Sequence, residues 1–558
     1  MIEDRTCTKA SDLDCIVVGH AELPFREYQR ILEPHRDVSS AYSNVLKNSV
    51  CLNGERLQYN ELLSYALTKA TGKSFRFSSF AAPCLPVVYL TSYLRRRGFQ
   101  VGYVNYFNDG KDRLEDLLGQ NPRAVALTTT FQFMSDPLLP LVRFIRDRAP
   151  QARIIIGGPY INNVCRDFQG KAQDFVLKQL GADIYVHDSQ GEATLAAVLT
   201  ALRQGSAASL AAIPNLIYRQ GSSFERTGRI PESNDLNQEK ILWKSFDADY
   251  LAPAAYMRTA LSCPFSCAFC TYPEVAGKHL VMDVDVVEQQ LREVHELGVT
   301  HLAFIDDTFN VPLPRFKNLL RMMIKNKFGI RWLSFLRPGN VDEEALDLMC
   351  ESGCMGSSLG IESGDDRILL NMNKKVTVER YRWGIEQLKK RGLYTAASFI
   401  IGFPGETSES VQNTIDFINE TAPTWFVAEQ YFHYDMTPVN QRAGEFGLKG
   451  GQYSWKHDTM DWKESARLLD EVYRQVRHSS ILPILGLGMW SLPYLEAHGI
   501  TPDKFLEFTK LAQPMLLESM TEAYVSLPPQ YEESLVNLFR NDAGAGEQNT
   551  GYRFSGAA

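Results

Sequence analysis

The feature that most constrains the fold is a sixfold repeat, over residues 253–440, of a short apolar run followed by an amphipathic segment. The segments between the runs carry apolar residues at helical spacing, as Val286, Leu291 and Val294 do. Six strand–helix units predict an open, partial (β/α)6 barrel and do not support eightfold closure. The chemistry of such a fold gathers at the carboxyl ends of its strands. The expected strands are 256–261, 301–305, 331–335, 357–361, 395–401 and 426–432.

A second strand–helix pattern precedes this barrel, over residues 11–240. Apolar strands that alternate with helices are typical of a doubly wound, Rossmann-like parallel sheet, so the whole chain is expected to be α/β. An insertion at about residues 23–82 interrupts the pattern and is not explained by it. The expected strands are 15–18, 100–104, 124–127, 153–156 and 183–186, with helices at 86–97 and 137–148.

The remaining chain carries weaker patterns. Residues 441–540 are expected to form a helical, aromatic-rich region. Residues 541–558 contain few residues that build a core, and this composition predicts a disordered tail.

Composition narrows the class of protein. Hydrophobic residues make up 44% of the 558 and charged residues 22%, which excludes a mostly disordered or fibrous chain. The net charge of −8 is opposite in sign to that of most proteins that bind nucleic acid phosphates. No apolar stretch reaches the roughly 18 residues that span a bilayer. The amino terminus lacks the layout of a secretion signal, so we expect a cytoplasmic protein with reduced thiols, no membrane and no nucleic acid partner.

Three cysteines follow the first barrel strand with the spacing C-x3-C-x2-C, at Cys263, Cys267 and Cys270. Thiolates are the ligands that iron–sulfur clusters, zinc and cuprous ions prefer. Three of them suit a [4Fe-4S] cluster whose fourth iron stays open to a small chelating molecule. A structural zinc site is the alternative, and its fourth ligand would be His279, nine residues after Cys270.

Three loops of the first region are expected at the ligand-binding edge of its sheet, since each follows a predicted strand. Paired glycines allow a ligand to lie close to the main chain. A structural domain with ordinary turn glycines is the alternative interpretation. The loop residues are Thr128, Thr129 and Thr130 after the third strand, Gly157, Gly158, Pro159 and Tyr160 after the fourth, and Ser189, Gln190, Gly191 and Glu192 after the fifth.

The cysteine spacing on the first strand of a βα barrel resembles the radical S-adenosylmethionine (SAM) superfamily. Three later segments extend the resemblance, at Phe304–Phe309, Gly360–Gly364 and Phe399–Glu406. The resemblance implies a [4Fe-4S] cluster held by the three cysteines. It implies SAM contacts at Asp307, Glu362, Ser363, Gly402 and the aromatic Phe269. Taken singly, the acidic pair at 306–307 could instead cap a helix, and the glycines at 402–405 could form an ordinary turn.

The first region, placed directly ahead of such a barrel, resembles the cobalamin-binding domain of cobalamin-dependent radical SAM enzymes. The threonines and paired glycines match the positions that surround cobalamin in that family. The D-x-H-x-x-G motif that supplies a histidine to cobalt in many corrinoid proteins is absent, because His20 lies in the unrelated sequence Val-Gly-His-Ala-Glu. Residues 14–19, 182–192 and 455–460 also resemble the branch that contains the phosphinothricin-pathway P-methyltransferases.

The resemblance implies a methyltransferase. It would move a methyl group from SAM, by way of methylcobalamin, to an unactivated carbon or a phosphinate phosphorus of a small or peptide-like natural-product intermediate. It also implies an electron donor of the flavodoxin or ferredoxin type. The alternative is a rearrangement or cyclisation without methyl transfer.

The residues that would contact substrate are weaker predictions. His433 and Tyr434 follow the sixth strand, His457 lies in an aromatic segment that could close over the cavity, and Arg337 follows the third strand. A buried histidine is more often structural than catalytic. Arg337 could hold a substrate carboxylate, or it could pair with Asp342 or Glu343.

Overall fold

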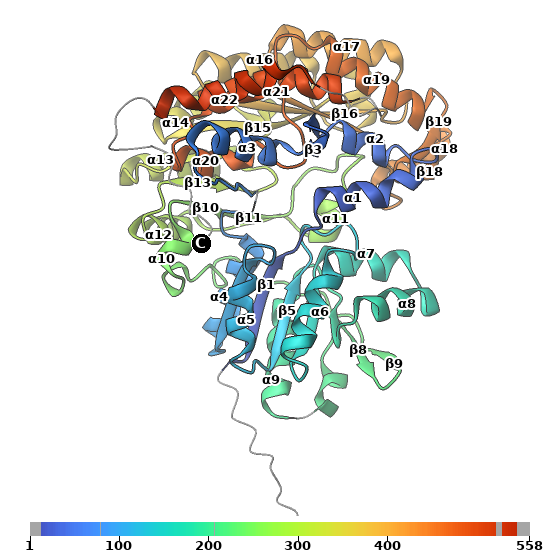
Figure 1. The fold of residues 1–558 in the computed structure, drawn as a ribbon, viewed down its shortest axis with the longest axis vertical. Helices are drawn as coiled ribbons and strands as arrows, with labels where there is room; N and C mark the ends of the chain where they lie inside the picture. Colours follow the sequence, from blue (N-terminus) through green and yellow to red (C-terminus); the bar gives the residue numbers. More distant parts are fainter. Residues whose placement is uncertain (1–12, 79, 206, 521–526, 544–558) are drawn as a thin grey trace, which may run out of the picture. The chain divides into compact units, whose positions relative to one another are not determined.

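The computed structural model describes residues 13–78, 80–205, 207–520 and 527–543. The chain divides into two compact units (Figure 1). Unit 1 comprises residues 1–23 and 83–247, and unit 2 comprises residues 24–82 and 248–558. Within the described ranges, no helix combines the length and the apolar character needed to span a bilayer.

Unit 1 is built on a seven-stranded sheet in the order β4-β1-β5-β6-β7-β8-β9. The first five strands are parallel, which confirms the predicted doubly wound sheet, and the last two add an antiparallel edge. That edge was not predicted because β9 buries no residue and therefore shows no apolar run. The strands are β1 (Cys15–His20), β4 (Val101–Tyr106), β5 (Ala124–Thr128), β6 (Arg153–Gly157), β7 (Ile184–Val186), β8 (Leu216–Gln220) and β9 (Ser223–Arg226).

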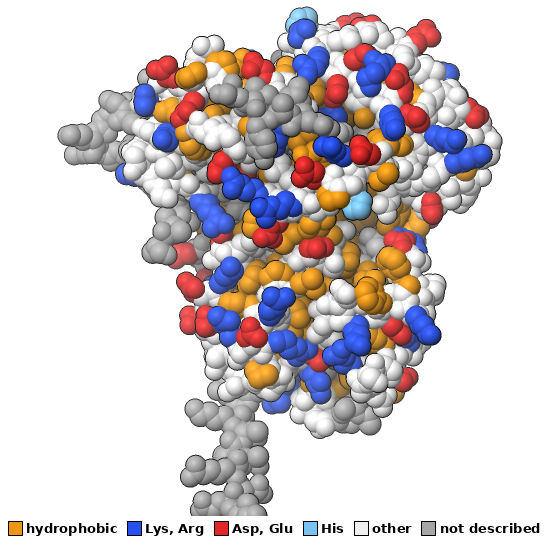
Figure 2. Space-filling view, turned by 45° about the vertical axis from the view of Figure 1, so that its right-hand side comes forward, with side chains coloured by type: hydrophobic (Ala, Val, Ile, Leu, Met, Phe, Trp, Pro, Cys, Tyr) orange, Lys and Arg blue, Asp and Glu red, His pale blue; other side chains and the backbone are white. Residues whose placement is uncertain are grey.

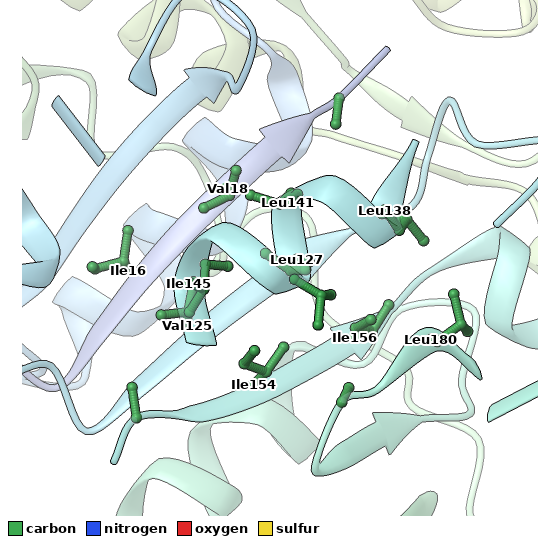
Figure 3. Close-up of a cluster of buried hydrophobic side chains, with 14 of the residues drawn as sticks. Ile16, Val18, Val125, Leu127, Leu138, Leu141, Ile145, Ile154, Ile156 and Leu180 are labelled. Carbon is green, nitrogen blue, oxygen red and sulfur yellow. The ribbon is translucent and has the colours of Figure 1, made fainter. Parts of the chain in front are cut away.

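Helices cover this sheet and build its core. All six residues of β1 are buried, as expected for a central parallel strand that is covered on both faces. Figure 3 shows α6 lying across β1, β5 and β6, with Ile16, Leu127 and Ile154 among the strand residues of this cluster. The helices of unit 1 are α4 (Leu85–Arg96), α5 (Lys111–Leu118), α6 (Leu138–Arg148), α7 (Pro159–Asp167), α8 (Gly170–Leu180) and α9 (Glu192–Arg203).

Unit 2 contains a parallel sheet of seven strands in the order β10-β13-β14-β15-β16-β17-β21. The six predicted strands are all present, and the short β21 adds a seventh at the edge. The strands are β10 (Ala254–Met257), β13 (His301–Phe304), β14 (Arg331–Leu336), β15 (Cys354–Glu362), β16 (Tyr394–Ile401), β17 (Trp425–Gln430) and β21 (Ser480–Ile481). The helices of this region are α10 (Ala248–Leu251), α11 (Tyr272–Ala276), α12 (Val284–Glu296), α13 (Leu313–Asn326), α14 (Glu343–Glu351), α15 (Asp366–Asn371), α16 (Val378–Lys390) and α17 (Ser408–Thr421).

The first predicted barrel strand is divided in two. The chain leaves the main sheet after β10, and β11 (Ala260–Leu261) pairs instead with β12 (Leu280–Val281). The buried carboxylate of Asp306 accepts hydrogen bonds from the backbone N–H groups of Thr259 (2.6 Å) and Ala260 (3.0 Å). These bonds fix the turn from which the cysteine loop begins.

The insertion belongs to unit 2 and not, as predicted, to the first domain. It packs against the carboxyl-terminal helices: the Cys51 N–H donates to Ser519 (2.8 Å), and Tyr59 contacts Phe508 edge-on. Figure 1 shows α3, in blue, beside α22, in red. The prediction failed because these partners lie more than 400 residues away along the chain. The elements of the insertion are α1 (Phe25–Leu32), α2 (Ala41–Leu46), β2 (Val50–Leu52), β3 (Glu55–Leu57) and α3 (Tyr59–Thr71).

The carboxyl-terminal region is helical, as predicted, but it also carries a small antiparallel sheet. Its helices are α18 (Ala443–Phe446), α19 (Trp462–Gln475), α20 (Leu492–Ala497), α21 (Pro502–Ser519) and α22 (Pro529–Ala543). The sheet consists of β18 (Lys449–Gly451), β19 (Ser454–His457) and β20 (Met460–Asp461). Of the predicted tail, residues 541–543 end α22 and the rest lies outside the described residues.

The surface carries charges of both signs. Figure 2 shows Lys and Arg side chains interspersed with Asp and Glu on the face that it draws. Many charged side chains of the described residues are paired, for example Arg96 and Arg97 with Glu239 at 2.8 and 2.5 Å. That face therefore carries a mixed pattern of charge and not a field of one sign.

Candidate active site

The cysteine loop starts at the end of β11, where Ser262 adopts a positive φ of 67°. A tight turn brings the last two cysteines together, since the Cys270 N–H donates to the Cys267 carbonyl (3.1 Å). Cys267 is buried and the other two are half-buried. Burial raises the pKa of the Cys270 thiol to about 11, and the charges of Cys267 and Cys263 raise it further. Thiolates in this loop therefore need positive charge beside them.

Two cations approach the loop. The Arg337 guanidinium stacks on the Phe265 ring (3.7 Å from its centroid), and its Nη1 lies 3.9 Å from the Cys267 sulfur. It also donates to the carbonyl of Lys374, whose ammonium lies 5.6 Å from the Phe269 ring centroid. The sequence did not single out Lys374. Lys374 lies in a turn that folds back onto the cysteine loop. The Ala268 N–H of that loop donates to the Met372 carbonyl of the turn (2.8 Å).

The contacts of Arg337 and the positions of the cysteines bear on two predictions, the pairing of Arg337 with an acid and the metal site. The pairing of Arg337 with Asp342 is wrong, because Asp342 accepts from the Ala345 N–H (2.9 Å) and binds Lys317 (2.6 Å). Among the described residues, no group of three or more His, Cys, Asp and Glu side chains converges to hold a metal ion. Ligation by the three cysteines stays a prediction. The soft thiol donors, half-open to solvent and flanked by two cations, fit an anionic iron–sulfur cluster.

The acidic pair after β13 has two different environments. Asp306 is fully buried and holds the backbone of the loop, as described above. Asp307 is exposed at the surface, but protein atoms crowd its carboxyl group and, with the charge of Asp306, raise its pKa to about 6. The next residue, Thr308, has its hydroxyl 3.2 Å from the Cys263 sulfur. Asp307 therefore stands beside the cysteine loop, where the Tyr272 hydroxyl contacts its carboxyl group.

The loop after β15 is strained and joins the same network. Glu362 adopts a positive φ of 72°, and its Oε1 lies 3.3 Å from the Lys374 ammonium. Strain of this kind costs about 1–3 kcal/mol and concentrates at functional sites. Ser363 is fully buried, and its hydroxyl accepts from the Asp365 N–H (3.2 Å). The structure thus brings Glu362 to the cysteine loop through Lys374, whereas the Ser363 side chain points into its own loop.

The loop after β16 is held by the small sheet of the carboxyl-terminal region. Gly402 has a φ of 95°, and a Cβ there would lie 2.2 Å from the Ser465 hydroxyl and 2.7 Å from Trp455. The Gly402 carbonyl lies 3.2 Å from Nε2 of His457, which stacks on Trp455. The other ring nitrogen, Nδ1, lies 3.0 Å from the Thr459 hydroxyl. His457 therefore supports the glycine loop through Nε2, and its predicted role at the substrate stays a prediction.

Glu406 closes this loop from the other side. Its carboxyl group is fully buried and accepts from the Gly402 N–H, while its Oε1 has no hydrogen-bond partner among the described residues. Burial raises the pKa of Glu406 from 4.5 to about 8. The folded state then holds a proton that the unfolded chain releases, so stability falls as the pH rises from about 4.5 to about 8.

Replacing this acid with its amide tests that sign. Glu406→Gln keeps the acceptor for Gly402 but carries no charge, so we expect it to raise the melting temperature at pH 8 and to change it little at pH 5. The upper limit of the effect is on the order of 4 kcal/mol. Thermal melts of both proteins at the two pH values measure it, with the exposed Glu386→Gln as the matched control. An equal shift at both pH values would contradict the assignment.

The remaining predicted substrate residues lie just beyond β17. His433 is buried, and its Nδ1 lies 3.0 Å from the Tyr431 hydroxyl. Burial lowers the pKa of His433, and the Asp435 carboxylate, 3.6 Å from Nε2, opposes this shift. Tyr434 is half-buried, and its ring packs against Phe432. The roles of both at the substrate stay predictions.

The three predicted loops of unit 1 do meet at the carboxyl edge of its sheet. The Thr129 hydroxyl donates to the Gly157 carbonyl (2.8 Å) and accepts from the Tyr160 N–H (3.2 Å). Gly158 has a φ of 103°, and a Cβ there would lie 2.9 Å from the Thr129 hydroxyl. Thr128 and Thr130 join their hydroxyls at 3.0 Å. The loops after β5 and β6 are therefore one rigid unit.

The third loop is held from behind. The backbone N–H of Asn234 donates to Oε1 of Gln190 (3.0 Å), and its side-chain Nδ2 donates to Oε2 of Glu192 (2.8 Å). Ser189 is exposed at the turn. The first of these loops also carries two aromatic residues that were not among the predicted ligand contacts. Phe131 and Phe133 are 44% and 89% exposed directly after the threonines. Large apolar side chains open to solvent at a ligand-binding edge favour a large, partly apolar ligand.

Comparison with known proteins agrees with this architecture. Residues 257–418 match the family model for the radical SAM superfamily. An uncharacterised methyltransferase of Pyrococcus horikoshii is 26% identical over 305 residues, which are 53% of this chain and 64% of that protein. The bacteriochlorophyllide d C-12(1)-methyltransferase of Chlorobaculum tepidum is 34% identical over 166 residues, 28% of this chain and 35% of that protein. The chain thus spans less than two thirds of either relative.

Solved structures share the fold over more of the chain. The radical SAM methyltransferase TsrM from Kitasatospora setae, solved with cobalamin and a [4Fe-4S] cluster, superposes with a TM-score of 0.58 at 16% identity. The match covers 84% of this chain and 97% of TsrM. The cobalamin-dependent radical SAM enzyme OxsB superposes with a TM-score of 0.50 at 15% identity, over 74% of this chain and 53% of OxsB. The chain therefore carries a radical SAM domain at residues 257–418, within a fold like that of cobalamin-dependent radical SAM enzymes.

Proposed function

We propose that this protein is a cobalamin-dependent radical SAM methyltransferase that acts on a small or peptide-like molecule. The observation that carries the proposal is the cysteine loop at the carboxyl edge of the open parallel sheet. The loops after β13, β15 and β16 flank it there, and Arg337 and Lys374 supply positive charge. The match to the radical SAM family model covers these same strands. The methyltransferases among its relatives support the reaction class.

The residues of unit 2 would hold the cluster and SAM. Cys263, Cys267 and Cys270 would bind three irons, and Arg337 beside Cys267 would stabilise the anionic sulfurs. Asp307 and Glu362 would accept hydrogen bonds from the methionine and ribose groups of SAM. Gly402 and Phe269 would lie beside its adenine. Ser363 would support the loop that carries Glu362. When bound, the cluster supplies one electron that cleaves the sulfonium of SAM. The side chains that surround the site would exclude water from the cleavage of SAM.

The residues of unit 1 would hold cobalamin. The threonine and glycine loops would surround the corrin ring and its nucleotide tail, and the exposed Phe131 and Phe133 would cover apolar parts of the ligand. When bound, cobalamin supplies the carrier for the methyl group. TsrM and OxsB, which share the fold, were both solved with cobalamin.

Three finer points belong to the same proposal. The accepting atom would be an unactivated carbon or a phosphinate phosphorus, as in the branch that the sequence resembles. A flavodoxin or ferredoxin would supply electrons. TsrM was solved with its substrate tryptophan, and this supports a small-molecule substrate here.

Anaerobic reconstitution tests the proposal. The full chain, loaded with iron, sulfide and cobalamin, should contain about four irons and about one cobalamin per chain. With a chemical reductant, SAM labelled in its methyl group and a panel of pathway metabolites, we expect 5′-deoxyadenosine, S-adenosylhomocysteine and a labelled product together. A product without the label would show rearrangement or cyclisation instead. Folded protein that binds no cobalamin would refute the methyl-carrier role.

A further inference from the structure

Arg337 is a buried cation that has no carboxylate beside it. The residue is 8% exposed, and its guanidinium stacks on the Phe265 ring and donates to the Lys374 carbonyl. Among the described residues, no ion pair joins Arg337 to an Asp or Glu side chain. Glu362, in the same network, pairs with Lys374 (3.3 Å) instead. Native proteins pair their buried charges, so the missing anion calls for an explanation.

The position of Arg337 is fixed at both ends of the residue. The buried Asn310 holds its backbone, since Oδ1 accepts from the Arg337 N–H and Nδ2 donates to the Arg337 carbonyl (both 3.0 Å). The Phe265 ring and the Lys374 carbonyl hold the guanidinium. Held in this way, Nη1 lies 3.9 Å from the Cys267 sulfur. The anion that Arg337 faces is therefore the thiolate of a predicted cluster ligand.

A second cysteine of the loop also has a polar neighbour. The Thr308 hydroxyl lies 3.2 Å from the Cys263 sulfur, and Thr308 is 7% exposed. A cysteine sulfur that binds iron has lost its proton and can only accept a hydrogen bond, so the hydroxyl would donate to it. Thr308 follows β13 and Arg337 follows β14, which are neighbours in the sheet. Two adjacent strands thus bring a donor to two different sulfurs of one loop.

Donors beside ligand sulfurs have a known physical effect. The reduction potential of an iron–sulfur cluster depends on its net charge, on its exposure and on hydrogen bonds to its sulfurs. Reduction adds an electron, and therefore negative charge, without breaking a bond. A fixed cation and a donated hydrogen bond stabilise the reduced cluster more than the oxidised one, so they raise the potential. The low dielectric of a buried site strengthens both interactions.

We propose that Arg337 and Thr308 raise the reduction potential of the cluster that the cysteine loop would bind. The inference rests on the proposed function and adds to it how the cluster is made easier to reduce. It gives Arg337 a role different from the predicted one at a substrate carboxylate, since the guanidinium acts on the cluster through Cys267 before a substrate is bound. With both side chains in place, a milder reductant suffices.

Redox titration of the reconstituted full chain, without SAM and without substrate, tests the proposal. Titanium(III) citrate supplies the electrons and is oxidised to titanium(IV), and electron paramagnetic resonance follows the reduced cluster. Arg337→Met removes the charge at similar length, and Thr308→Val removes the hydroxyl at similar size. Arg337→Lys keeps the charge. The matched control is Lys390→Met, because Lys390 is exposed at the end of α16.

Each variant has its own expected midpoint potential. Arg337→Met should lower it by at least about 59 mV, which is a tenfold smaller ratio of reduced to oxidised cluster at a fixed potential. A unit charge at this distance has at least such an effect when the effective dielectric constant is about 20. Thr308→Val should lower it less, because a hydroxyl carries only partial charges. Arg337→Lys should restore most of the difference, and Lys390→Met should change nothing.

The outcomes separate this inference from the proposed function. If Arg337→Met assembles the cluster and keeps the natural potential, the inference is wrong, and weaker SAM binding in that variant would make Arg337 a SAM ligand instead. If Arg337→Met assembles no cluster, Thr308→Val decides, and an unchanged potential there refutes the inference. If the potentials shift as expected but no methylated product forms, only the methyltransferase proposal fails. A natural chain that takes up no iron–sulfur cluster refutes both.

Discussion

Cys263→Ser, Cys267→Ser and Cys270→Ser should each abolish iron binding and SAM cleavage. Each variant leaves two thiolates where the cluster needs three. Loss of a residue that only supports a metal ligand costs about 10–100-fold in affinity or activity. Loss of a ligand itself should therefore exceed about a hundredfold. Iron content and the yield of 5′-deoxyadenosine after anaerobic reconstitution measure the effect.

The matched control is Cys350→Ser, because Cys350 is exposed and lies on α14, outside the cysteine loop. It should keep the full iron content. If a cysteine variant of the loop retained four irons per chain, or if zinc bound to the natural chain in place of iron, the assignment of the cluster would be wrong. Circular dichroism of each variant separates loss of the cluster from loss of the fold.

The second large effect is expected from Gly402→Ala. The added Cβ would overlap the Ser465 hydroxyl and the Trp455 ring, and the residue would keep a φ of 95° that alanine adopts at a cost. Backbone strain and overpacking each cost about 1–3 kcal/mol, so the sum is on the order of 3 kcal/mol or more. The glycine loop should shift, with a lower melting temperature and at least about tenfold weaker SAM binding by equilibrium dialysis.

Gly392→Ala is the control for this variant. Gly392 also has a positive φ, of 70°, but a Cβ there meets no atom within 4 Å. It carries the backbone strain without the overlap, so we expect a smaller loss of stability and unchanged SAM binding. Equal losses in the two variants would show that strain alone, and not the contact with Trp455 and Ser465, accounts for the result.

The sequence predicted those parts of the molecule that rest on local patterns. The six barrel strands and the five parallel strands of unit 1 were visible as apolar runs, because strands covered on both faces are apolar throughout. The loops at their carboxyl ends were found for the same reason, since parallel strands deliver their end loops to one edge. The position of the cysteines, Asp307 and Glu362 followed from the strand that each one ends.

Other parts depend on contacts between distant segments and leave no local signal. The contacts of the Arg337 guanidinium with Phe265 and Cys267 could not be predicted, because both partners lie about 70 residues away along the chain. Lys374 lies in a turn after a short helix, with nothing in its neighbourhood to mark it. The sheet β18–β20 was missed because its strands have only two to four residues. His457 gains its contacts with Gly402 and Thr459 only when the chain is folded.

The path of the chain through its two units sets an order for synthesis on the ribosome. The polypeptide contributes β1 to unit 1, leaves it for the insertion, and returns at residue 83. Since β1 lies between β4 and β5, its neighbours emerge only after the insertion has been made. The insertion in turn waits for α21 and α22, which follow the barrel in the sequence and pack against the insertion. Because the segments of the two units alternate along the chain, a single cut in the gene isolates neither unit. The helices of the insertion are made before their partners, so they are candidates for chaperone binding.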